Sequence, residues 1–261
     1  MKKLIVSLTC AVLLAACGKD KTDSAAEVSA PAFAAVKTYK VTSYVYTPFV
    51  IRNSKGEVGG FETEVLQAVA AKQNIRFEFS PMLAAWDVLF KSVESGQADL
   101  LSAAMYPNPE RAARFEVSDS YMDTRFALLS AKGIIVNGLA DLRGKRLAVF
   151  AKSMADREIR SLSYADEIKI VPINSIYEGV KAVVGGKADV VYGDQVVLTY
   201  YANQFKDEGL RLSADPKAQQ HQFIFLIRKG DTELLAQVNA GLAAIKADGT
   251  LEKIKNKWLA R

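Results

Sequence analysis

The residues that could do chemistry gather at the ends of two apolar strands. Residues 95–101 (SGQADLL) are similar to residues 185–191 (GGKADVV), and each segment follows a predicted helix and opens an apolar strand. The two strands end at residues 104–106 and 193–194. Because ligands bind beyond the carboxyl ends of strands in open α/β sheets, a ligand held between two such units would contact both ends. Chance similarity is the competing explanation, since the shared G-x-A-D pattern is short.

Catalytic chemistry has little support in the residue pattern. General acid–base catalysis needs a positioned acid or base with a tuned pKa, yet His221 is the single histidine and lies outside any motif. The sequence contains no H-E-x-x-H run and no nucleophile motif with a partner base. Glu62 could serve as an acid, but it starts a predicted helix, where an acidic side chain is favoured anyway. We therefore expect no catalytic residue, no metal site and no cofactor.

Alternating strand and helix patterns must position the two strand ends. β-rich or alternating apolar segments predict strands at residues 40–45, 76–79, 100–104, 146–150, 168–171 and 190–192. Helical spacing and stop signals predict helices at residues 61–74, 86–95, 153–161, 175–184, 232–246 and 251–259. This alternation indicates an α/β fold with largely parallel sheets.

Composition and charge exclude several classes of protein. The chain has 261 residues, of which 50% are hydrophobic, so it can bury a substantial core in one large or two medium domains. Disordered, collagen-like and small disulfide-rich chains are excluded. The net charge is +5, from 34 basic and 29 acidic residues, and the two signs alternate along the chain. Nucleic-acid binding shows a clustered basic face, so we expect no nucleic-acid partner.

The N-terminus has the pattern of a bacterial export signal. Lys2 and Lys3 precede the apolar run 4–16, which is shorter than the ~20 residues that span a bilayer. The run ends in LAAC at residues 14–17, which resembles the lipobox of bacterial lipoproteins. We therefore expect a signal peptide at residues 1–16 and lipidation, including palmitate, at Cys17. A plain secretory signal with an incidental Cys17 is the alternative.

Residues 17–37 are rich in Ala, Ser, Lys and Asp and have no apolar period, so they predict a flexible tether. With Cys17 lipidated and Cys10 removed, no free thiol remains for a disulfide or a Cys-based metal site. The expected location is outside the cytoplasm, with the folded domain in the periplasm or on the cell surface. Two lipid chains would hold it stably on a membrane.

A set of short motifs runs in a fixed order along the folded part. They are YTPF (46–49), GFETEV (60–65), the helix from 86 to 96, PERA (109–112), SDSY (118–121), LRGKR (142–146), RKGD (228–231) and ADGT (247–250). Each is weak alone. In this order and spacing, from about Tyr39 to Trp258, the set resembles the bacterial extracellular solute-binding proteins of family 3, the polar amino-acid receptors of ABC importers.

The resemblance implies a two-lobed type II periplasmic-binding fold, in which each lobe is a mostly parallel sheet flanked by helices. Lobe 1 would hold residues 38–123 and 222–261, and lobe 2 would hold residues 124–221. Two crossing segments would form a hinge about which the lobes close. The implied function is that of a monomeric substrate-binding lipoprotein. It would capture a small solute, most often a polar or uncharged L-amino acid, and deliver it to membrane permease subunits.

The resemblance also implies roles for single residues. Arg111 would hold the ligand carboxylate through a bidentate pair, and the helix start at Ser153 and Met154 would be a second anion site. Asp194 and the carbonyl of Ala104 would accept from the ligand ammonium. From the residues alone, Asp194 is instead a cap for the next helix, and Ser153 is an N-cap, a role compatible with ligand contact.

Aromatic residues would enclose the rest of the ligand. Tyr46 and Trp86 match the pocket aromatics of the family, with ordinary core packing as the alternative. Tyr106 stands where the family has a small hydroxyl residue, and its backbone N–H can still face the carboxylate. Met154 replaces another hydroxyl, and Lys152 replaces the usual glycine.

These departures bear on the ligand. Receptors for basic amino acids often carry an acid where this chain has Ser43, so we do not expect a Lys, Arg or His ligand. The bulk of Tyr106 leaves open a small or non-standard ligand, including one that is not an α-amino acid. Two other functions stay open: an exported cyclohexadienyl-dehydratase-like enzyme on the same fold, and a ligand sensor or surface lipoprotein without an importer.

Overall fold

The computed structural model describes residues 36–82, 84–214 and 218–259. The predicted signal peptide and Cys17 lie outside the described residues. No helix within the described part of the chain combines the length and hydropathy needed to cross a membrane.

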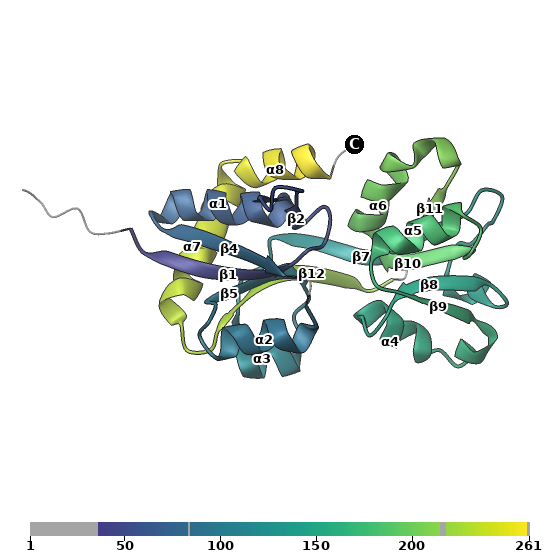
Figure 1. Ribbon diagram of the computed structural model, residues 1–261, viewed down its shortest axis with the longest axis horizontal. Coiled ribbons are helices and arrows are strands. Elements are labelled where there is room, and N and C mark those ends of the chain that lie inside the picture. The colour runs from purple at the N-terminus through teal and green to yellow at the C-terminus, as the bar shows by residue number, and fades with distance from the viewer. Residues whose placement is uncertain (1–35, 83, 215–217, 260–261) are drawn as a thin grey trace, which may run out of the picture. The chain divides into compact units, whose positions relative to one another are not determined.

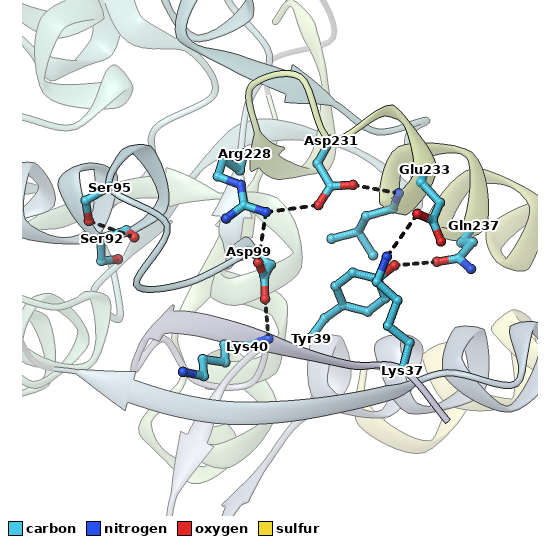
Figure 2. Close-up of polar contacts among 11 residues, drawn as sticks. Lys37, Tyr39, Lys40, Ser92, Ser95, Asp99, Arg228, Asp231, Glu233 and Gln237 are labelled. Atoms are coloured by element: carbon cyan, nitrogen blue, oxygen red, sulfur yellow. Dashed lines mark hydrogen bonds and ion pairs between the residues drawn. The ribbon is translucent and has the colours of Figure 1, made fainter. Parts of the chain in front are cut away.

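The predicted tether meets the folded domain at its last residue. The backbone N–H of Arg76 donates to the carbonyl of Lys37 at 2.9 Å. The Lys37 Nζ atom also lies 2.9 Å from a carboxylate oxygen of Glu233, as Figure 2 shows. Contacts with the fold therefore begin one residue before the first strand.

The first half of the domain contains a sheet whose central strand is parallel to both neighbours. Its strands are β1 (Thr38–Tyr44), β4 (Arg76–Met82), β5 (Leu100–Met105), β6 (Phe115–Val117) and part of β12 (Gln220–Arg228). Strand β1 lies between β4 and β5 and is parallel to both, whereas β12 is antiparallel to β5 and β6. A small separate hairpin joins β2 (Ile51–Arg52) to β3 (Val58–Gly59).

Helices cover both faces of this first sheet. They are α1 (Phe61–Gln73), α2 (Trp86–Glu94), α3 (Pro109–Arg114), α7 (Thr232–Ala247) and α8 (Thr250–Trp258). Figure 1 shows α1 and α8 on one face and α2 and α3 on the other, and α7 packs against α1. The α1–α7 contact needs a glycine, because a Cβ atom on Gly241 would lie only 2.6 Å from a Val69 methyl carbon.

The second half repeats the parallel arrangement. Its strands are β8 (Arg146–Phe150), β9 (Lys169–Ile173), β10 (Val190–Asp194), β11 (Arg211–Ser213) and part of β7 (Met122–Ser130). Strand β8 lies between β9 and β10 and is parallel to both, while β7 is antiparallel to β10 and β11. The helices are α4 (Met154–Arg160), α5 (Ile176–Val184) and α6 (Gln195–Gln204), with single 3₁₀ turns at Leu139–Leu142, Ala165–Glu167 and Lys206–Glu208.

Two strands connect the halves. Strands β7 and β12 form an antiparallel ladder in which His221 lies opposite Thr124 and Gln222 opposite Asp123. Beyond this ladder β12 continues into the first sheet and β7 into the second (Figure 1). The predicted crossings between residues 123 and 124 and between 221 and 222 fall within the ladder.

The repeated G-x-A-D segments occupy equivalent positions in the two halves. The Asp99 carboxylate accepts the backbone N–H of Lys40 at 2.8 Å, and the Asp189 carboxylate accepts that of Arg146 at 2.7 Å. Each aspartate also pairs with an arginine, Asp99 with Arg228 at 3.3 Å (Figure 2) and Asp189 with Arg146 at 2.7 Å. The same hydrogen bond, from a backbone N–H of one strand to an aspartate at the start of its parallel neighbour, thus occurs in both halves. This confirms the prediction of two similarly built α/β units.

Candidate functional site

A cavity of about 540 Å³ lies at the carboxyl ends of β5 and β8. Both halves of the domain contribute to its wall. Seven of the eight predicted ligand residues line it: Tyr46, Trp86, Ala104, Tyr106, Arg111, Ser153 and Met154. The structure thus brings together residues more than a hundred positions apart in the sequence. The end of β5 lines the cavity as expected, whereas Gly193 and Asp194 at the end of β10 do not, and the end of β8 takes that place.

Arg111 is positioned by the start of helix α3. Asn108 caps this helix by accepting the backbone N–H of Arg111 at 2.7 Å, and Pro109 occupies the first turn. The Arg111 guanidinium donates to the carbonyl of Tyr106 and lies 5.8 Å from the centre of the Phe90 ring. Burial, followed by the charge of Arg157, lowers the pKa of Arg111 to about 10. Within the described part of the chain, Arg111 forms no ion pair with a carboxylate, so its charge is available to an anion.

Asp194 lies behind the cavity wall rather than on it. It ends strand β10 and is 6% exposed. One carboxylate oxygen accepts the Tyr46 hydroxyl at 3.2 Å, and the other accepts the Tyr106 hydroxyl. Asp194 occupies the N-cap position of α6, as the alternative interpretation expects, but its side chain makes no capping hydrogen bond. Its predicted contact with a ligand ammonium stays a prediction, since the two tyrosines cover the carboxylate.

The ring of Tyr106 is held by both connecting strands. Its centroid lies 5.8 Å from Phe126 on β7 and 5.2 Å from both His221 and Phe223 on β12. Burial lowers the pKa of His221, which favours a neutral ring at this contact. Tyr106, which stands where the resemblance places a small hydroxyl residue, therefore packs against both connecting strands and donates its hydroxyl to Asp194.

Burial of Asp194 makes the stability of the protein depend on pH. Desolvation raises its pKa from 3.8 to about 6, although the hydroxyls of Tyr106 and Tyr46 act in the opposite direction. The folded state therefore binds a proton more tightly than the unfolded state. The resulting stabilisation is complete below pH 3.8 and is lost as the pH rises through about 6.

We expect Asp194→Asn to remove this dependence. Between pH 4 and pH 7, the free energy of unfolding should fall by up to about 3 kcal/mol more in the unmodified protein than in the variant. Urea unfolding at several pH values measures both profiles, and their difference isolates Asp194 from other carboxyls. Parallel profiles would show that Asp194 has an ordinary pKa.

Two aromatic side chains form an apolar part of the wall. Trp86 begins α2 and stacks on Tyr44, with ring centroids 5.0 Å apart and an interplanar angle of 30°. Tyr46 stacks on Phe49 at 6.0 Å. Burial, together with the charge of Asp194, raises the pKa of the Tyr46 hydroxyl well above its usual range, so it remains a hydrogen-bond donor. Both residues combine a buried packing face with contact to the cavity.

The turn before α4 supplies the wall from the second half. Ser153 is the N-cap, because its hydroxyl accepts the backbone N–H of Asp156 at 3.1 Å. The Asp156 carboxylate accepts the backbone N–H of Lys152 at 2.9 Å in return. Lys152 has φ 62°, a left-handed conformation in which glycine carries no strain. The structure thus gives a physical reason for the glycine that the resemblance places there.

The role of Glu62 as a buried hydrogen-bond acceptor was not predicted from the sequence. This residue is completely buried in the first turn of α1 and does not line the cavity. Its carboxylate accepts the backbone N–H of Ala104 at 2.8 Å, the hydroxyl of Ser102 at 2.6 Å and the hydroxyl of Tyr121. Burial raises the pKa of Glu62, while these donors oppose the shift.

Glu62 therefore fixes the end of strand β5 where it meets the cavity. Ala104 has φ 48°, a left-handed conformation that is unfavourable for alanine and needs support from its surroundings. The hydrogen bond from the Ala104 N–H to Glu62 gives that support. Acidic residues are common at helix starts, so the sequence pattern does not single out Glu62. What distinguishes Glu62 is its hydrogen bond with Ala104, 42 residues away.

Comparison with known proteins agrees with this geometry. The sequence model of the bacterial extracellular solute-binding proteins, family 3, matches residues 40–261. The amino-acid-binding protein AabA of Dichelobacter nodosus is 28% identical over 213 residues, which cover 81% of this chain and 83% of that protein. A probable histidine-binding protein of Neisseria gonorrhoeae is 28% identical over 265 residues, covering 100% and 97% of the two chains.

A solved structure shows the same fold. An ancestral arginine-binding protein bound to arginine superposes with a TM-score of 0.74 and is 27% identical, over 85% of this chain and 97% of that one. The family match spans most of the sequence, and the structural match spans the two-lobed α/β domain. The chain belongs to the bacterial extracellular solute-binding proteins, family 3.

Proposed function

We propose that this protein is the substrate-binding component of an ABC importer, which captures a small solute bearing a carboxylate and presents it to a membrane permease. The observation that carries the proposal is the cavity built from both halves, with the guanidinium of Arg111 facing it and free of any carboxylate partner in the described residues. Relatives are named as amino-acid-binding proteins, and amino acids also carry a carboxylate, which supports a solute of this kind.

Capture would proceed by closure of two lobes about the β7–β12 ladder. We assign residues 38–123 and 222–261 to lobe 1 and residues 124–221 to lobe 2. The ladder supports this division, because it is the segment in which both connecting strands pair with each other. Hinges of this kind absorb a change of backbone angle at a few residues while the sheets on either side stay rigid. Closure would shape a surface that the permease recognises.

The exported, lipid-anchored state is part of the same proposal. The family is described as extracellular, which agrees with the export signal at residues 1–16. Lipid on Cys17 would tether a monomeric receptor close to its permease, with residues 17–37 as the link. Partition of the full chain into a detergent phase, lost in Cys17→Ala, would test the anchor. Equal partition of both chains would argue for a plain secreted protein.

We propose binding without catalysis. Neither His221 nor Glu62 lines the cavity, and the Glu62 carboxylate is occupied by three donors from the protein. His221 and Glu62, the residues that could act as an acid or a base, would therefore not contact a solute bound in the cavity. One similar structure, 27% identical, is described as an ancestral amino-acid-binding protein that is a precursor of cyclohexadienyl dehydratase. An assay for turnover of prephenate or arogenate therefore belongs beside the binding test.

The test is the melting temperature of the protein against a panel of L-amino acids and small dicarboxylates. The chain is unfolded and refolded first to remove any solute carried from the cell. A ligand present at about 100 times its Kd adds roughly 2.7 kcal/mol of stability, which gives a readable shift. We expect a shift with one or a few compounds, and no turnover of prephenate. A panel without any shift would contradict the proposed function.

A further inference from the structure

The charged groups around the cavity are mostly cations. Four basic side chains line it, Arg111 and Arg114 from the first half and Lys152 and Arg157 from the second, and Glu110 is the acid that lines it. Arg114 is already paired, with Glu94 at 2.7 Å and with Glu110 at 3.3 Å.

The other three cations lack such partners. Among the described residues, none of Arg111, Lys152 and Arg157 lies within ion-pair distance of a carboxylate. The Arg157 guanidinium donates to the backbone carbonyl of Lys152 at 3.3 Å. The Arg111 guanidinium likewise donates to a backbone carbonyl, that of Tyr106. Arg111 and Arg157 line the same cavity, one from each half, and the charge of Arg157 contributes to the lowered pKa of Arg111. Two cations without carboxylate partners in one cavity fit two separate anionic groups.

Among the described residues that line the cavity, no carboxylate is free to accept an ammonium group. Both oxygens of Asp194 are engaged by the hydroxyls of Tyr46 and Tyr106, and Asp194 does not line the cavity. Glu110 is exposed and engaged by Arg114. A cation brought into a cavity that already holds unpaired positive charges loses hydration and gains no counter-charge.

We infer that the ligand is a small dicarboxylate without an ammonium group, held at one end by Arg111 and at the other by Arg157 and Lys152. Trp86 and Phe90 provide the apolar surface for the carbon chain between the two carboxylates. Arginine binds each carboxylate through two donors in one plane, so the two arginines define both ends of the ligand. This inference rests on the proposed function and narrows its solute.

Calorimetric titration of the refolded full chain tests the inference with matched probes. Glutarate and L-glutamate have the same carbon chain and two carboxylates, and they differ by the ammonium group. We expect glutarate, or the shorter succinate, to bind at least about tenfold more tightly than L-glutamate. L-Glutamine and L-arginine should not bind. Binding of any of these amino acids with no binding of either dicarboxylate would overturn the inference and leave the proposed function intact. Binding of no probe would count against both.

Two variants test why the cavity would bind a dicarboxylate more tightly than an amino acid. Arg157→Gln should weaken glutarate binding at least about tenfold, because it removes the cation at one end of the ligand. Tyr106→Ser should free one oxygen of Asp194 and open space beside it, so the ratio of L-glutamate to glutarate affinity should rise at least about tenfold. Unchanged affinity in Arg157→Gln, or an unchanged ratio in a folded Tyr106→Ser protein, would overturn the arrangement. The comparison of probes on the unmodified chain decides the issue if Tyr106→Ser does not fold.

Discussion

Arg111→Ala should weaken ligand binding by about 2 to 5 kcal/mol, which corresponds to a loss of roughly 30-fold or more in affinity. The guanidinium is largely removed from water, and among the described residues no carboxylate competes for it. Truncation therefore leaves the carboxylate of the ligand in a desolvated site without its charge partner. Calorimetric titration with the compound that gives the largest shift in melting temperature measures the loss.

Arg114→Ala is the matched control for this prediction. Arg114 lies on the same helix and lines the same cavity, but its guanidinium is paired with Glu94 and Glu110. Because these acids already neutralise it, its removal should change affinity much less than removal of Arg111. Arg111→Lys keeps the charge but loses the planar fork, so its affinity should be intermediate. Near-native binding by Arg111→Ala would contradict the assignment of the site.

Glu62→Ala should lower the free energy of unfolding by at least about 3 kcal/mol, through the loss of acceptors for three buried donors. Each buried donor left without a partner costs about 1 to 3 kcal/mol. The donors are the Ala104 N–H and the hydroxyls of Ser102 and Tyr121, and the site is closed to water. Folded domains have a total stability of about 5 to 15 kcal/mol, so the loss is severe. Urea unfolding at pH 7 measures it.

Glu62→Gln and Tyr121→Phe separate the hydrogen bonds from the shape of the side chain. The glutamine carbonyl can still accept from Ala104 and Tyr121, and its amide can donate to the Ser102 hydroxyl. It should therefore retain most of the stability that Glu62→Ala loses. Tyr121→Phe removes one donor and its need for an acceptor together, so its effect should be small. Equal destabilisation by Glu62→Ala and Glu62→Gln would show that the buried charge itself is required.

Sequence patterns predicted strands β5 and β10 because both are uniformly buried. Every residue of β5 and of β10 is buried, and such apolar runs are visible without any partner. Strands β7 and β12 were not predicted. The exposure of their first residues alternates while the chain passes between the halves, and only their later residues form a continuous buried run. A strand that belongs to two sheets in succession does not show one period.

Seven residues of the cavity wall were predicted through resemblance, whereas Phe90 and Arg157 on the same wall and the interactions behind it were not. Tyr106 and Asp194 are 88 residues apart, and the contact between them depends on how the two halves meet. The same is true of Glu62 and Tyr121, 59 residues apart. Sequence spacing shows which side chains share one helix or strand, and it contains no information about such long-range pairs.

The path of the chain through the two sheets has a consequence for the order of folding. The second half is one continuous stretch, so β10 and β11 can pair with β7, and β8 with β9 and β10, as soon as this stretch of chain is complete. The first sheet waits for β12, and the face of α1 that receives α7 waits for the last helices of the chain. An unfinished chain therefore exposes apolar surface around Val69 until its final residues are made, and this surface invites aggregation or chaperone binding. The cavity is lined by residues between 46 and 157, so its wall is made before β12, the strand that pairs with both β5 and β7.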